Sequence, residues 1–137
     1  MASMTLAACT REIIELHDFF QAWFTGTVND DEANFERFAG VMDDAFTIIG
    51  PDGLLTELAG LVDRLQRAHA NYADLRIWTE NHRLLRQQGD WLLCTYEEWQ
   101  ETPPATTVRL SSVLFQHDDS TPNGVRWLHV HETWLNS

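Results

Sequence analysis

The hydrophobic pattern of this chain changes its period at about Tyr72. Before that residue, apolar side chains recur at the three- and four-residue spacing of helices that bury one face. After it, apolar and polar residues alternate, as is typical of half-buried strands. The predicted strands are 75–85, 91–101, 106–117 and 125–135. Short turns between them favour an antiparallel sheet, and the segregation of helices from strands indicates the α+β class.

Three helices are expected in the first half of the chain. The first covers residues 10–25, the second follows the run of capping residues 29–31 and stops near 43–44, and the third is capped by Thr56. A short strand is predicted at 45–49, before a Gly-Pro-Asp-Gly turn. A chain of 137 residues suits one domain. We therefore expect a flexible segment over residues 1–9 and a single domain over residues 10–135.

The charge balance excludes several classes of function. There are 21 acidic residues against 9 basic ones, which gives a net charge of −12, and all the basic residues are arginines. Such a chain repels nucleic acid and anionic membranes, and it cannot form a lysine Schiff base. Cys9 and Cys94 are too few for a disulfide framework, so we expect reduced thiols in a cytoplasmic protein. No glycine-rich phosphate loop is present, and we expect no cofactor.

Two segments carry a family resemblance. Residues 43–53 read Asp-Asp-Ala-Phe-Thr-Ile-Ile-Gly-Pro-Asp-Gly, and residues 126–133 read Arg-Trp-Leu-His-Val-His-Glu-Thr. With the order of elements, they resemble the nuclear transport factor 2-like superfamily, the cystatin-like α+β roll that includes ketosteroid isomerase and SnoaL-like cyclases. The resemblance implies three N-terminal helices packed on a strongly curved antiparallel sheet, with a pocket in the cone. The aspartates and tyrosines of the known isomerases and dehydratases of this superfamily have no clear counterparts here.

Strand alternation selects candidate site residues. His129, His131 and Thr133 share one face of the last predicted strand. The resemblance to SnoaL-like endings implies that this face lines the pocket, so we expect it to meet the polar residues of the neighbouring strands, Tyr96, Glu98, Arg109 and Ser111. A histidine beside a carboxylate in an apolar cone suits general acid/base chemistry, so His131 and Glu98 are the candidate catalytic residues.

The other members of this set are candidate ligand-binding residues. Arg109 can hold a carboxylate, and the remaining candidates are Tyr96, Ser111, His129, Thr133 and, from the first helix, Trp23. The alternative is that His131 is a buried, hydrogen-bonded histidine and that Arg109 and Glu98 form a cross-strand ion pair. His129 and His131 have the spacing of metal ligands, but a third ligand such as Glu98 would be needed and two ligands do not make a closed site, so no metal site is predicted. His17 is expected at a boundary or on the surface, with the mouth of the pocket as the alternative position.

Two functions remain open. The first is a SnoaL-like protein that binds a small, partly apolar molecule, either without turnover or as an isomerase, dehydratase or cyclase. The second is a non-catalytic homodimerisation or accessory module whose pocket is filled by aromatic side chains, Phe20, Trp23, Phe24 and Trp127. Trp91, Trp99 and Trp134 are expected on the outer face of the sheet, where a second copy of the chain would bury them. The expected partners are thus a small molecule and a second copy, with no nucleic acid and no membrane.

Overall fold

The computed structural model describes residues 2–135, which form three helices and a sheet on one side of them. The elements in chain order are α1 (Ala2–Thr25), α2 (Glu32–Ala39), β1 (Met42–Ile49), β2 (Leu55–Glu57), α3 (Leu58–Ala68), β3 (Arg76–Gln88), β4 (Trp91–Thr102), β5 (Ala105–His117) and β6 (Val125–Trp134). The α+β class is therefore confirmed. None of the described helices is long and apolar enough to cross a membrane.

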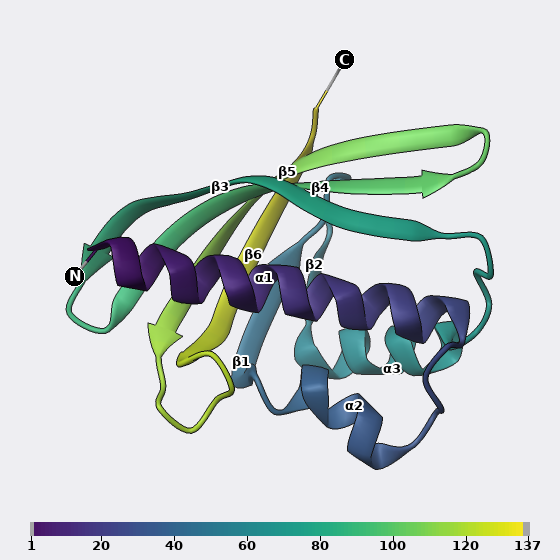
Figure 1. Ribbon diagram of the computed structural model, residues 1–137, viewed down its shortest axis with the longest axis horizontal. Coiled ribbons are helices and arrows are strands. Elements are labelled where there is room, and N and C mark those ends of the chain that lie inside the picture. The colour runs from purple at the N-terminus through teal and green to yellow at the C-terminus, as the bar shows by residue number, and fades with distance from the viewer. Residues whose placement is uncertain (1, 136–137) are drawn as a thin grey trace.

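The sheet is open, curved and mixed. Its strand order is β2-β1-β6-β5-β4-β3, and β3 to β6 form the predicted antiparallel meander. The expected antiparallel sheet is confirmed for these four strands, and β1 departs from it by lying parallel to β6. The reversals from β3 to β6 bring the last strand beside β1 in the same direction, and α2 and α3 lie near that end of the sheet (Figure 1).

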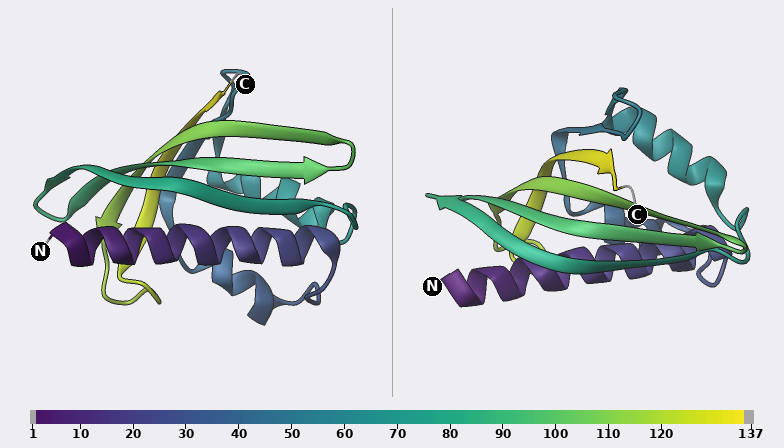
Figure 2. Two further views of the ribbon diagram at one scale, coloured as in Figure 1. Left: turned by 45° about the horizontal axis from the view of Figure 1, so that its top comes forward. Right: turned by 90° about the horizontal axis from the view of Figure 1, so that it is seen from above.

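All three helices lie on the concave side of the sheet, and α1 crosses it from end to end (Figures 1 and 2). The prediction that this helix starts at Thr10 is wrong, since the helix extends back to Ala2 and Cys9 is fully buried. Asp31 caps α2 as predicted, and its carboxylate accepts a hydrogen bond from the Asn34 amide at 2.8 Å. Thr56 lies in β2 and does not cap α3, which begins after Glu57.

A buried acid ties the first helix to the rest of the fold. Glu12 of α1 is fully buried and accepts two hydrogen bonds from the Arg37 guanidinium of α2, at 2.8 and 3.2 Å. It also accepts one from the Trp127 indole of β6 at 2.8 Å and one from the Asn123 amide at 3.1 Å. A buried carboxylate is tolerated only when its oxygens are paired in this way. The network therefore fixes α1 against α2 and the start of β6.

The last strand contains one extra residue. Phe115 of β5 pairs with Trp127, but the preceding residue, Leu114, pairs with His129, so Leu128 has no partner in the register. A bulge of this kind reverses the alternation of all the side chains that follow it. Beyond the bulge, the residues on the concave side are therefore Val130, Glu132 and Trp134.

Candidate functional site

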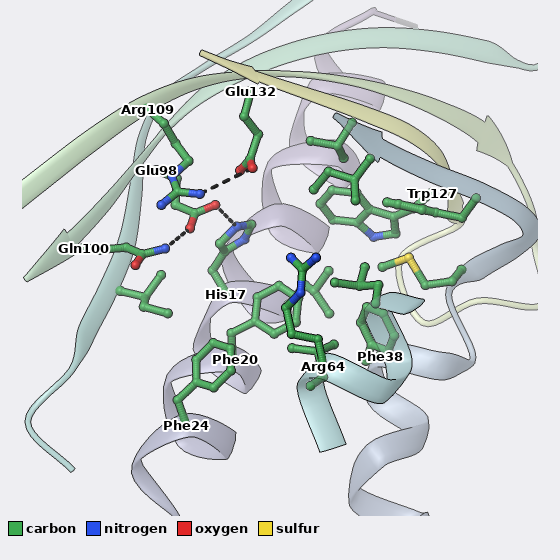
Figure 3. A pocket seen from close by; sticks show the side chains of 18 of the residues that line it. His17, Phe20, Phe24, Phe38, Arg64, Glu98, Gln100, Arg109, Trp127 and Glu132 are labelled. Carbon is green, nitrogen blue, oxygen red and sulfur yellow. Dashed lines mark hydrogen bonds and ion pairs between the residues drawn. The ribbon is translucent and has the colours of Figure 1, made fainter. Parts of the chain in front are cut away.

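A cavity of about 190 Å³ lies between α1, α3 and the concave face of the sheet. Most of its wall is aromatic or aliphatic. The apolar lining residues are Leu16, Phe20, Phe24, Phe38, Met42, Phe46, Ile48, Leu61, Leu65, Ile77, Trp127 and Val130. A cluster of charged and polar side chains lies at one end, and Arg64 reaches toward the cavity from α3 (Figure 3). The cavity thus combines an apolar body with one polar end, as small-molecule sites commonly do.

His17 and Glu98 form a buried pair at the polar end. The Nε2 atom of His17 lies 3.0 Å from Oε1 of Glu98, and the second oxygen of Glu98 accepts a 2.5 Å hydrogen bond from the Gln100 amide (Figure 3). The Nδ1 atom of His17 lies 2.7 Å from the carbonyl oxygen of Ile13. A carbonyl only accepts, so Nδ1 carries a proton, and Nε2 donates to an ionised Glu98 only when His17 is a cation.

Arg109 and Glu132 form the second pair. Nη1 of Arg109 donates to Oε1 of Glu132 at 3.3 Å, and the guanidinium lies 4.7 Å from the centre of the Trp134 ring. The Nε–H of Arg109 is buried without a hydrogen-bond partner among the described residues. The Arg109–Glu132 pair therefore keeps a free hydrogen-bond donor, whereas both oxygens of Glu98 in the first pair are already bonded.

The two carboxyl groups have pKa values on opposite sides of their usual range. Burial opposes ionisation of Glu98, but the charge and hydrogen bond of His17 outweigh it and lower the pKa of Glu98 to about 2. Burial lowers the pKa of His17, yet the effect of Glu98 is greater, and the pKa of His17 is raised. Burial and then the charge of Glu98 raise the pKa of Glu132 to about 7, against the opposing effect of Arg109. The cluster thus holds one ionised carboxylate and one carboxyl that titrates near neutrality.

Three of the predicted site residues line this cavity: Tyr96, Glu98 and Arg109. Tyr96 is 2% exposed, and burial followed by the charge of Glu98 raises the pKa of its hydroxyl. Ser111 is opposite Tyr96 in the register and is fully buried, although it does not reach the cavity wall. The suggested ion pair between Arg109 and Glu98 is not formed, because Arg109 is bonded to Glu132.

The prediction that His129, His131 and Thr133 face the cavity is wrong. The bulge at Leu128 turns these three side chains to the outer face, where His131 is exposed and Nδ1 of His129 lies 2.8 Å from the hydroxyl of Thr47. Their predicted roles in catalysis and binding therefore have no support from the geometry. Trp23 is also outside the cavity lining: it is fully buried in the core, and its indole donates to the Leu65 carbonyl at 2.7 Å.

Sequence reasoning gave a pocket position for His17 only as the less favoured alternative, and it missed Gln100, Arg64 and Glu132. His17 is 4% exposed, which contradicts the expected boundary or surface position. Its place four residues after Ile13 and three before Phe20, on the apolar stripe of the first helix, was the available signal. Glu132 carried no such signal, because the bulge that turns it inward follows from strand pairing.

The outer face of the sheet matches its prediction only in part. Trp99 stacks on Trp78 of the neighbouring strand with ring centres 5.9 Å apart, and Trp91 is 53% exposed. Trp134 was also expected there, but it lies on the concave side, over the guanidinium of Arg109. Among the described residues, no group of three or more potential metal-ligating side chains comes together.

Comparison with known proteins gives the family. Residues 9–136 match the model of the sucrose-6-phosphate phosphohydrolase C-terminal family. The chain is 24% identical over 128 residues to sucrose-phosphatase 2 of Nicotiana tabacum and 23% identical over 127 residues to sucrose-phosphatase 1 of the same plant. These matches cover 91% and 90% of this chain but 30% of each relative, so the chain spans about a third of the length of these phosphatases.

Solved structures give the fold. An NTF-2-like protein of unknown function from Pseudomonas aeruginosa superimposes with a TM-score of 0.84 at 23% identity, covering 94% of this chain and 99% of that one. The CaMKII hub of S. rosetta superimposes with a TM-score of 0.70 at 15% identity, covering 98% and 96%. The predicted resemblance to the nuclear transport factor 2-like superfamily is thereby confirmed. The chain belongs to the sucrose-6-phosphate phosphohydrolase C-terminal family, built on the nuclear transport factor 2-like fold.

Proposed function

We propose that this protein binds a small, largely apolar molecule in the cavity between α1, α3 and the sheet. The observation that carries the proposal is the combination of open volume with buried charge. Four ionisable side chains, His17, Glu98, Arg109 and Glu132, lie at one end of a mostly apolar cavity. Charged groups are costly to bury, and apolar residues of similar volume would stabilise a packed core at least as well. Retaining them is consistent with a role toward a ligand.

The size of the cavity limits the ligand. Its volume of about 190 Å³ is somewhat larger than the roughly 150 Å³ of an engineered apolar cavity that binds benzene. The fitting molecule is therefore about one ring in size with one polar substituent. Acid/base turnover, as in an isomerase, dehydratase or cyclase, extends the same proposal, because Glu98 and Glu132 supply carboxyls with well separated pKa values.

The test is to fill the cavity. Leu61 of α3 lines it, whereas Leu93 of β4 lies on the opposite face of the sheet. We expect toluene and indole to raise the melting temperature of the wild-type protein and of the control variant Leu93→Phe, but not that of Leu61→Trp. An unchanged melting temperature in the wild type, or an equal rise in Leu61→Trp, would refute ligand binding in this cavity.

A second candidate function is self-association as an accessory module. The outer sheet face favours it, since this face carries the stacked pair Trp78–Trp99 and three half-buried leucines, Leu93, Leu110 and Leu114. The solved neighbours also include association domains of calcium/calmodulin-dependent protein kinase II. Light scattering at micromolar concentration should give a dimer or larger species, which Leu110→Glu should dissociate. A wild-type monomer under these conditions would eliminate this candidate.

A further inference from the structure

The polar end of the cavity has an uneven distribution of free hydrogen-bonding groups. Both oxygens of Glu98 are occupied, one by His17 and one by Gln100. Glu132 has a single long hydrogen bond, to Arg109 at 3.3 Å, and its second oxygen has no partner among the described residues. The Nε–H of Arg109 is likewise unpartnered. The capacity to bond a ligand therefore lies with Glu132 and Arg109.

The charges around Glu132 decide what kind of group fits beside it. Glu98 and Tyr96 of β4, Arg109 of β5 and His17 of α1 influence this part of the cavity, while Arg64 of α3 lies on the wall and bonds the Thr56 hydroxyl at 3.3 Å. His17 and Glu98 compensate each other, so Glu132 and Arg109 determine the local balance. Below a pH of about 7, where the pKa of Glu132 lies, its carboxyl is mostly neutral and offers an O–H donor. Both residues line the same cavity, so each can then offer a donor to one ligand.

We propose that the cavity binds its ring-sized ligand through one acceptor oxygen, to which neutral Glu132 and the Arg109 guanidinium both donate hydrogen bonds. The ligand class is a cyclic or aromatic molecule that carries a carbonyl or carboxylate oxygen, with its ring against Phe20, Phe24 and Phe38. This inference rests on the proposed function, since it names the chemistry of the molecule that occupies the same cavity. A ligand that presents only donors, such as an ammonium ion, would oppose both groups.

The proposal predicts a defined pH dependence. When Glu132 loses its proton it no longer donates, and its negative charge repels an acceptor oxygen. Binding therefore weakens as the pH rises through about 7. If only the neutral carboxyl supports binding, Kd increases about tenfold between pH 6 and pH 8. His17 has a raised pKa as well, so a variant of Glu132 is needed to assign the effect.

The experiment compares four single-ring probes of similar size by calorimetry or tryptophan fluorescence at pH 6 and pH 8. Acetophenone offers a neutral acceptor, benzoate an anionic acceptor, benzylamine a cationic donor, and toluene no polar group. We expect acetophenone or benzoate to bind at least tenfold more tightly than toluene at pH 6, and to weaken about tenfold at pH 8. Benzylamine should not bind more tightly than toluene. The ratio of acetophenone to benzoate tells whether the acceptor is neutral or anionic.

Two variants assign the effect to one residue. Glu132→Gln keeps a donor in its amide but cannot titrate, so the acceptor probes should bind with the same Kd at both pH values. The control variant Glu97→Gln removes a carboxylate from the outer face of β4, next to Glu98 in the sequence, and should retain the tenfold change in Kd between pH 6 and pH 8. Thermal melts confirm that both variants are folded.

Three results would overturn the proposal. They are tighter binding of benzylamine than of the acceptor probes, equal binding of toluene and acetophenone, and a pH dependence that persists in Glu132→Gln. Toluene binding without a preference for an acceptor oxygen would leave the proposed function intact and refute only this inference. Failure of all four probes to bind would refute both.

Discussion

Removing Arg37 should destabilise this protein far more than removing an arginine from an exposed ion pair. Arg37 is the only cation bonded to the fully buried Glu12 among the described residues, and it donates two of the four hydrogen bonds that this carboxylate accepts. Arg37→Met leaves the carboxylate buried with only the neutral donors of Trp127 and Asn123. Breaking a buried pair in this way costs about 3–5 kcal/mol.

The expected melting temperature follows from the size of the chain. With an unfolding entropy of about 2.1 cal/mol/K per residue, a loss of about 3 kcal/mol lowers the melting temperature of a 137-residue domain by about 10 °C. The matched control is Arg67→Met, since Arg67 pairs with Asp63 on α3 with both side chains mostly exposed. An exposed pair of this type contributes about 0.5 kcal/mol or less, so the control should shift by at most about 2 °C.

The double variant separates lost charge pairing from lost packing. Adding Glu12→Gln to Arg37→Met removes the unpaired charge and should recover part of the lost stability, because an uncharged amide is cheaper to bury. Differential scanning calorimetry and urea titration supply the two measurements. Equal shifts in Arg37→Met and Arg67→Met would refute the reasoning, as would a double variant less stable than either single one.

Three further outcomes are expected. Because the pKa of Glu132 is raised from 4.5 to about 7, its protonation stabilises the fold fully below pH 4.5, and this contribution is lost as the pH rises toward 7. In urea titrations from pH 5 to 8, the free energy of unfolding should therefore fall less steeply with pH in Glu132→Gln than in the wild type. An equal slope in the two proteins would contradict this. Gly53→Ala should lower the free energy of unfolding by about 1–2 kcal/mol, because an alanine there must adopt a left-handed backbone conformation. Gly26→Ala should lower it further, because the new Cβ would also lie 2.7 Å from the Ala70 Cβ. Equal melting temperatures of the two variants would argue against that contact. Trp23→Phe should lower the free energy of unfolding, measured by urea titration, by about 1–3 kcal/mol, because the buried Leu65 carbonyl of α3 loses the indole as its donor. An unchanged free energy of unfolding would mean that water replaces the indole.

Strand alternation predicted the site well where the strands are regular. β4 and β5 pair residue for residue without a register shift, so alternation predicts the correct face for Tyr96, Glu98 and Arg109. The same rule failed in β6, because alternation cannot register an inserted residue. Regular alternation therefore predicts Glu132 on the outer face and His131 on the inner face, the reverse of what the pairing produces.

Long-range pairing accounts for the other differences. The parallel contact of β1 with β6 joins segments about eighty residues apart, and no local pattern specifies it. The burial of His17 depends on Glu98 in β4, since a histidine on an apolar stripe is stable there only with a partner. The observed start of α1 at Ala2, earlier than predicted, likewise depends on long-range contact, because the helix continues for as long as it packs across the sheet.

The bulge in β6 also affects how this sequence is compared with others. An unbulged strand with the same inward residues would be one position shorter at Leu128. Aligning this chain with such a strand requires a one-residue gap at that position. Without the gap, every column after Trp127 pairs an inward residue with an outward one, and Glu132 is matched to a position on the opposite face. A relative that conserves the cavity carboxyl would then be scored as having substituted it. The position of the gap should therefore be taken from the strand pairing before cavity residues are assigned in relatives.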